Sequence, residues 1–421
     1  MSTWHKLTRL LLWTEVWVVA AAVLAGMLWA PALSAAPLAG LVYALLHLAL
    51  RKRLPGPTPA DLAILLLGLI LAVNYTTAAV PALAGPASLR LLGGIALYYA
   101  VVHWCRTSTR LRGLAALSAL AAAGLSLLSL VAVEWTSGKL FFIPQAVYAR
   151  FTLLVSNTIH PNVMGGSLAA LLPLALGVPL FAWRRLTGVE RLLYPLAFLV
   201  ALGALVLTQS RGALLAAMAA LGILLLFRSR WFWALPALAV LAIVSAGFIL
   251  GPGELQTRAL DIISVEGFGQ RADIWQHTLY LLQDFPLTGV GMGHFPQAFA
   301  LLYPLSLAPA ARMLPHAHNL FLQVAADLGL PGLVAWSSVL LASLAATWQA
   351  FHSGLRLGRP RLRAISIGLF GCQAAVLLHG LLDAVLWGDI RPAPLVWWLW
   401  GLGMAALNIT RRLSQERFRA Q

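Results

Sequence analysis

The chain has 421 residues, of which 61% are hydrophobic and only 10% are charged. Soluble domains carry about 25% charged residues, and the mean hydropathy here is +0.85. This composition excludes a soluble globular protein, a disordered chain and a nucleic-acid-binding domain, although the formal net charge is +16. The basic residues stand in short clusters between long apolar runs, which is typical of a protein that crosses a membrane many times.

Twelve segments are apolar enough to predict membrane-spanning helices, since a span needs about 20 mostly apolar residues. In chain order they are Leu11–Ala30, Ala36–Leu50, Leu62–Val80, Leu89–Val102, Leu114–Val133, Met164–Trp183, Leu192–Leu207, Ala213–Phe227, Phe232–Leu250, Leu320–Ala350, Ile365–Trp387 and Pro394–Ile409. Basic residues precede the first segment and small residues follow it, as in a signal peptide. Its apolar stretch exceeds the roughly 7–15 residues of a signal-peptide core, so we expect a retained helix.

The distribution of Lys and Arg indicates the orientation of the chain. With the N-terminus in the cytoplasm, every even-numbered connection and both termini coincide with a basic cluster, as the positive-inside rule requires. Eight basic residues fall outside these clusters, on the expected outer face: Arg90, Lys139, Arg150, Arg211, Arg258, Arg271, Arg312 and Arg391. They have no role in orienting the chain, and several of them therefore become candidates for substrate binding.

We expect two parts, with N-terminal transmembrane helices in residues 1–133 and a second transmembrane part in residues 134–421 that contains an outer loop, 251–319. Within that loop, Gly269–Phe285 has apolar residues at helical spacing. Gly289–Gly293 follows as a glycine-rich turn, which we interpret as a tight backbone path. The two cysteines, Cys105 and Cys372, are expected to be small buried side chains without a disulfide.

A polar break, Thr208–Ala213, separates two apolar runs on the expected outer face. A charge at membrane depth is costly and marks a functional candidate, although Arg211 can also be a helix-end anchor that reaches the interface. The neighbouring Gln209 and Ser210 are small or polar and favour a pocket. We therefore interpret Arg211 as functional and the other two as substrate-binding.

A second candidate site is His316-Ala317-His318-Asn319, just before the tenth predicted helix. Two histidines at this spacing can bind a metal, but zinc sites use three or four ligands, and no third ligand is close in sequence. One histidine acting as a base at neutral pH is the better functional interpretation, with two interface histidines as the alternative. We expect no metal and no cofactor.

Other candidates are weaker when taken alone. Arg271 can be an ordinary salt-bridged residue at a helix start, and Asn162, after His160-Pro161, is typical of a turn and helix cap. Asp383 lies inside the eleventh predicted helix, where pairing with an outer arginine is one expectation. Together, the outer arginines and a histidine suit an anionic substrate, such as a diphosphate, that is bound without metal.

The sequence resembles the O-antigen ligase and polymerase superfamily over roughly residues 150–405. Four blocks occur in the family's order, and the lead-in before the sixth predicted helix is also similar. The first block, Thr208–Ala213, is similar to (T/S)xSRGA, and the second, Arg271 to Trp275 with Phe285–Phe295, is similar to R…W…PLxGxGxGxF. The third block, His316–Gln323 with Asp327–Gly332, is similar to HxHNxxLxxxxxxGxxG. The fourth block, His379–Asp383, is similar to a late H…D helix.

The resemblance implies a metal-independent, GT-C-like membrane glycosyltransferase for cell-envelope polysaccharide. Such an enzyme transfers a glycan from an undecaprenyl-diphosphate carrier to an acceptor hydroxyl on a lipid core, a glycan end or a protein, at the outer face of the cytoplasmic membrane. It implies that Arg211 and Arg271 bind the diphosphate and that His318 activates the acceptor. His316, Asn319, Asn162, Arg312 and Arg391 are then expected to contact substrate.

Two other functions remain open from the sequence. A transporter or flippase for a lipid-linked glycan would also need cationic residues on the outer face, but transporters often show inverted repeats, and none is visible. A non-catalytic membrane subunit would leave the outer arginines and the histidine pair without a role.

Overall fold

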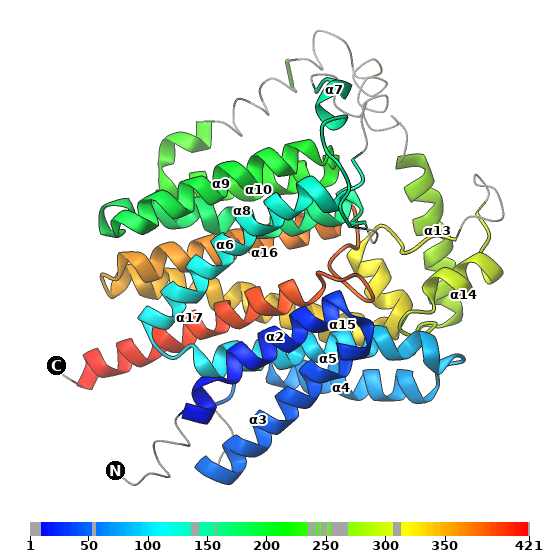
Figure 1. The fold of residues 1–421 in the computed structure, drawn as a ribbon, viewed down its shortest axis with the longest axis horizontal. Helices are drawn as coiled ribbons and strands as arrows, with labels where there is room; N and C mark the ends of the chain where they lie inside the picture. The colour runs from blue at the N-terminus through cyan, green and yellow to red at the C-terminus, as the bar shows by residue number, and fades with distance from the viewer. Residues whose placement is uncertain are drawn as a thin grey trace.

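A computed structural model shows an all-α protein whose long helices lie side by side in a bundle (Figure 1). The structure describes residues 10–52, 56–135, 143–155, 158–234, 268–305 and 313–419, with single positions at 238, 241, 244, 245, 251 and 253. Eight helices in these residues are long and apolar enough to cross a membrane, and two apolar helices are shorter. The expected all-α, multi-pass membrane fold is confirmed.

The N-terminal helices are α2 (Glu15–Leu28), η1 (Ala30–Ser34), α3 (Ala35–Arg51), α4 (Asp61–Thr76), α5 (Pro81–Trp104) and α6 (Ser108–Ala132). The middle of the chain forms α7 (Gln145–Tyr148), α8 (Pro161–Ala182), η2 (Trp183–Arg185), α9 (Gly188–Leu207), α10 (Arg211–Arg228) and η3 (Arg230–Trp233). The last helices are α13 (Phe268–Asp284), α14 (Phe295–Leu302), α15 (Leu320–Arg356), α16 (Pro360–Gly380) and α17 (Pro394–Arg419).

The helices α8 and α16 form the centre of the bundle and are the most deeply buried of the long helices. They cross closely at two glycines, where a Cβ on Gly177 would lie 2.8 Å from the Cα of Gly368. Small residues at such crossings let helix backbones pack tightly in a membrane. Around this centre, α2 and α3 pack on α5, α5 packs on α17, and α4 packs on α15.

Eleven of the twelve predicted segments are helices in the structure, and the ninth, Phe232–Leu250, lies mostly outside the described residues. The segments that looked shortest extend beyond their apolar cores, as α5 shows by beginning at Pro81. The eleventh segment was predicted too long, because α16 ends at Gly380 and residues 381–393 form turns. The predicted helix at Gly269–Phe285 is confirmed as α13, and Cys105 and Cys372 are buried and free, as expected.

The start of α2 and the end of α17 lie at one end of the bundle, and α13 and α14 lie at the other (Figure 1). Basic residues from distant segments meet at the first end. Arg112 pairs with Glu190, Arg361 approaches the same carboxylate at 3.9 Å, and Arg417 donates to the carbonyl of Arg356. We call this the basic end of the bundle.

We predict twelve spans with the basic end in the cytoplasm. A reporter fused after Gln421 should therefore be active only in the cytoplasm, because Lys and Arg are retained on that side. A fusion at Gly138, in the first long outer stretch, serves as the opposite control. A C-terminal reporter that is active only outside the cytoplasm would contradict the orientation.

Candidate active site

The two histidines of the H-x-H segment converge on one carboxylate. The Nδ1 atoms of His318 and His316 lie 3.3 Å and 3.5 Å from Oδ1 of Asp383, and the two ring centroids are 4.4 Å apart. On a helix, residues i and i+2 do not face each other, so a helix start at this segment would predict that the two rings point in different directions. That expectation is wrong, because α15 begins only at Leu320 and His318 has a left-handed φ of 48°.

Asp383 is the centre of the cluster and is only 3% exposed. It lies just beyond the end of α16, and not inside a helix as predicted. Its Oδ2 accepts a hydrogen bond from Nδ2 of Asn162 at 2.9 Å, and its Oδ1 also accepts one from the backbone N–H of Ala384. Among the residues that the structure describes, the partners of this carboxylate are two histidines and an asparagine, and not the outer arginine that the sequence suggested.

The charge state of Asp383 follows from these contacts. Burial alone would raise the pKa of this carboxyl group. The hydrogen bond from His318 and the nearby His316 and His379 outweigh burial and hold the pKa well below its usual range. The group is therefore an anion at neutral pH, able to orient an imidazole.

The hydrogen bonds assign the protons of the two histidines. The backbone N–H of His318 donates to Nδ1 of His316 at 3.3 Å, so that nitrogen carries a lone pair. Burial lowers the pKa of His316 to about 4, against an opposing effect of Asp383. His316 is thus neutral. The Nδ1–H of His318 donates to Asp383, which leaves its Nε2 as an acceptor on a side chain that is 24% exposed.

A chain of hydrogen bonds supports the backbone between the two histidines. The carbonyl of Ala317 accepts from the indole of Trp275 on α13 at 3.1 Å, and its N–H donates to Gln323 at 2.7 Å. Gln323 donates in turn to Asp327, which also accepts from the indole of Trp387 at 2.8 Å. Two of these supports, Trp275 and Trp387, come from distant segments, and sequence reasoning did not identify them.

The glycine-rich turn has the tight backbone path that its composition predicted. Gly289 has a positive φ and packs on the break in α15, where Gly329 has φ 71°. A Cβ on Gly289 would lie 2.4 Å from the carbonyl oxygen of Ala326, so no other residue fits. Asn74 of α4 fixes the same region, since it donates to the carbonyl of Asp327 and accepts from the N–H of Met292.

Arg211 and Arg271 lie at the same end of the bundle as this cluster. Arg211 is the first residue of α10 and is exposed, and a Cβ on the adjacent Gly212 would lie 3.4 Å from Leu382, next to Asp383. Arg271, in the first turn of α13, is close enough for its positive charge to help lower the pKa of His316. That both arginines face one cavity stays a prediction.

The polar residues beside Arg211 have structural partners. Gln209 is fully buried with a left-handed φ of 50°, and its amide donates to the hydroxyl of Tyr148 at 2.6 Å. Ser210 is buried at the N-terminal cap position of α10. The contact with Tyr148 on α7 was not visible from the sequence.

Three further residues were expected to contact substrate, namely Asn319, Arg391 and Arg312. The side chain of Asn319 caps α15 by accepting from two backbone N–H groups, and its amide donates to the carbonyl of Leu381 at 3.1 Å. Arg391 lies beyond α16 and lines the cavity described next. Arg312 lies outside the described residues.

A cavity of about 620 Å³ lies between α2, α5, α6, α8 and α17. Its wall is almost entirely apolar and includes Trp17, Leu125 and Trp398. Polar groups line part of it, among them His160 and Arg391. His160 is also close enough to His316 to affect its pKa, so the polar part of the cavity adjoins the histidine cluster.

His316, His318 and Asp383 each offer one ligand atom, and these atoms lie within 4.8 Å of one another. The sequence argument against a metal rested on the absence of a third ligand close in sequence. Folding brings Asp383, 65 residues from His318 in the sequence, to the two histidines.

The fold defines a multi-pass, all-α membrane protein, with an aspartate-oriented histidine and two arginines at one end of its bundle. A family model described as O-antigen ligase matches residues 196–337. This match confirms the resemblance to the O-antigen ligase and polymerase superfamily over a segment that includes Arg211, Arg271 and His318. No curated protein matches the sequence significantly.

His316 should not shape the pH dependence of the site. With its pKa lowered to about 4, the ring stays neutral between about pH 5 and 8, the range in which an ordinary histidine titrates. We expect the acid limb of the pH–rate profile in His316→Gln to stay where it is in the wild-type protein. A midpoint that moves by about one pH unit would contradict this assignment.

Proposed function

We propose that the protein transfers a glycan from an undecaprenyl-diphosphate carrier to an acceptor hydroxyl at the outer face of the cytoplasmic membrane. The observation that carries this proposal is the 3.3 Å contact between His318 and the buried carboxylate of Asp383, in a chain that matches the O-antigen ligase family. A carboxylate that holds one imidazole N–H fixes the tautomer and orients the other nitrogen as a base.

In this reaction, Nε2 of His318 takes the proton of the acceptor hydroxyl. The acceptor oxygen forms a bond to the anomeric carbon of the glycan, and the bond from that carbon to the diphosphate oxygen breaks. The electron pair leaves with the diphosphate. The anionic Asp383 stabilises the imidazolium that forms, and proton transfer of this kind contributes typically 10²–10⁴-fold to the rate.

Arg211 and Arg271 are proposed to stabilise the negative charge that develops on the leaving diphosphate. Arginine presents a planar set of donors that matches phosphate oxygens, and donors fixed in advance lower the barrier when charge develops. The closeness of Arg271 to His316 supports its place in the site. Arg312 and Arg391 are proposed to bind other parts of the donor.

The remaining candidates are proposed to shape the site through their own contacts. Asn162 donates to Asp383, and Asn319 joins the start of α15 to the turn after α16. Gln209 and Ser210 hold the backbone that leads to Arg211. His316 accepts from the backbone of His318 and so fixes the position of the base.

The apolar cavity of about 620 Å³ supports a polyprenyl carrier as the donor. A long hydrocarbon chain needs an apolar wall, and its charged head must lie at the polar end of the same cavity. Here that polar part holds His160 and Arg391 and adjoins the histidine cluster. The lipid chain is proposed to lie between α2, α6 and α17.

Glycan transfer by the purified protein tests this proposal. The protein in detergent is incubated with a lipid-linked glycan and three acceptor classes (a lipid core, a glycan end and a protein), with EDTA throughout. We expect a glycosylated acceptor to form. Loss of activity in EDTA that a divalent ion restores would overturn the metal-independent mechanism. Movement of the lipid-linked glycan across vesicles without transfer to any acceptor would indicate a transporter.

A further inference from the structure

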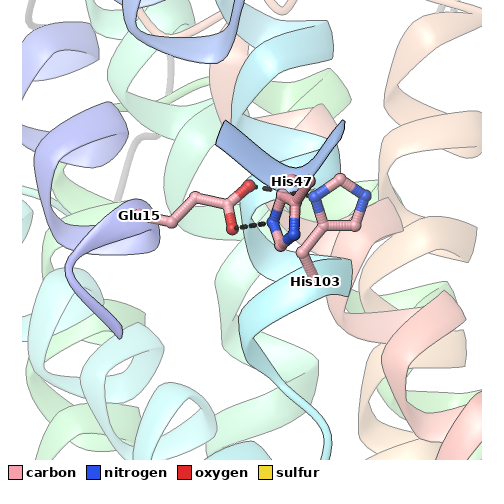
Figure 2. Close-up of side chains that lie close together, drawn as sticks. All are labelled: Glu15, His47 and His103. Atoms are coloured by element: carbon pink, nitrogen blue, oxygen red, sulfur yellow. Dashed lines mark hydrogen bonds and ion pairs between the residues drawn. The ribbon is translucent and has the colours of Figure 1, made fainter. Parts of the chain in front are cut away.

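A second cluster of ionisable side chains lies among the N-terminal helices, where Glu15 of α2 contacts two histidines (Figure 2). Its Oε2 lies 3.0 Å from Nε2 of His47 on α3, and its Oε1 lies 2.9 Å from Nδ1 of His103 on α5. Glu15 is 4% exposed and His47 is 1% exposed. The side chain of His103 is the most accessible of the three, at 12%.

The composition of this region makes the convergence notable. Residues 1–133 contain only two acidic residues, Glu15 and Asp61, and only three histidines, His5, His47 and His103. Folding brings two of these histidines to one of the two acids, across 32 and 88 residues of sequence. The cluster lies at the basic end of the bundle, at the start of α2 and near the ends of α3 and α5. It is therefore far from the site that transfers the glycan.

We propose that Glu15, His47 and His103 bind one divalent transition-metal ion, with Zn²⁺ as the best-suited ion. Two imidazoles and a carboxylate are ligands that zinc accepts, and they also suit other first-row metals. One ligand atom from each residue lies within 4.8 Å of the others. Ligands at 2.0–2.2 Å from a tetrahedral ion are about 3.3 Å apart, so small side-chain movements bring all three onto one ion.

The buried charge of Glu15 fits a bound cation. A carboxylate in an apolar bundle is costly unless a positive charge compensates it, and a divalent ion between the three side chains supplies that charge. Nε2 of His47 faces Glu15 and is the nitrogen available to the ion.

The ion would link three helices that otherwise pack through apolar side chains. Metal binding that requires the folded arrangement adds its binding free energy to the stability of the fold. Three protein ligands leave a fourth position, which a water molecule occupies in comparable zinc sites. His103 is the least buried ligand, so that position and the approach of the ion lie on its side.

The test begins with a background protein in which the other possible cluster is removed by His316→Ala, His318→Ala and Asp383→Asn. This protein is stripped with EDTA, reloaded with Zn²⁺ and analysed for bound metal by mass spectrometry. We expect one ion per chain and a higher unfolding temperature with Zn²⁺. Adding Glu15→Gln removes one ligand, so it should weaken zinc binding by roughly 100-fold or more, which exceeds the loss from replacing a residue that only hydrogen-bonds to a ligand. It should also abolish the rise in unfolding temperature. His352→Ala, at the far end of α15, is the matched control that keeps both.

A gain-of-signal variant covers the case in which Glu15→Gln does not fold. In His47→Cys, loaded with Co²⁺, a thiolate-to-cobalt charge-transfer band should appear in the near-ultraviolet spectrum, because a cysteine thiolate replaces one ligand. The background protein without this change should lack the band. A background protein that binds neither Zn²⁺ nor Co²⁺, a stoichiometry unaffected by Glu15→Gln, or a cysteine variant without the band would each overturn the proposal and leave a purely hydrogen-bonded cluster.

Discussion

Replacing His318 with alanine is expected to lower the rate of glycan transfer by roughly 10²–10⁴-fold, the usual contribution of a positioned base. The imidazole has its Nδ1–H on the buried carboxylate of Asp383, and Nε2 is left to accept the hydroxyl proton. Single-turnover rates, with purified protein in excess over the lipid-linked donor, measure this loss. His316→Ala should reduce the rate less, because His316 is neutral and its Nδ1 is occupied by the backbone of His318.

The control for this experiment is His352→Ala, since His352 lies near the far end of α15 and contacts a carbonyl of its own helix. Its transfer rate should equal that of the wild-type protein. Full activity in His318→Ala would remove the base from the mechanism. The arginines would then be electrostatic catalysts without a partner that accepts the proton.

Arg211→Lys and Arg271→Lys are each expected to lower transfer by roughly 10²-fold, the scale of losing one fixed donor to a developing negative charge. Lysine keeps the charge but lacks the planar, two-pronged guanidinium, so it cannot bind two phosphate oxygens side by side. Transfer rates at saturating donor separate this loss from weaker binding. The effect should fall mainly on kcat.

Arg359→Lys is the matched control, because Arg359 is exposed between α15 and α16 at the basic end of the bundle. It should transfer glycan at the wild-type rate. If Arg211→Lys and Arg271→Lys both retained near-normal transfer, neither arginine would have the proposed role at the diphosphate.

The arrangement of helices was largely predictable because membrane burial leaves a direct trace in the sequence. Each span needs a long apolar run, and the basic clusters divide those runs at the correct places, as Arg184 and Arg185 do between α8 and α9. The end of α16 was not predictable in this way. Residues 381–387 are as apolar as a helix, but the chain turns after Gly380, where a Cβ would lie 2.9 Å from the side chain of Leu320.

The site was predictable residue by residue but not in its geometry. The histidines and arginines stood out because polar groups are rare in this sequence, and a resemblance to a family connected them. The common partner of the two histidines, Asp383, depends on a turn between α16 and α17. The supports at Trp275 and Trp387 depend on contacts with segments 42 and 60 residues away, for which local spacing gives no signal.

The most direct test of glycan transfer is to measure both products of one reaction by the purified protein. A donor labelled in the glycan and in the lipid is mixed with an acceptor that is glycosylated in the native envelope. We predict equal amounts of glycosylated acceptor and free undecaprenyl diphosphate from the wild-type protein, and neither product above background from the double variant His318→Ala, Arg271→Ala. Absence of both products from the wild-type protein, or equal yields from the double variant, would contradict the proposed function.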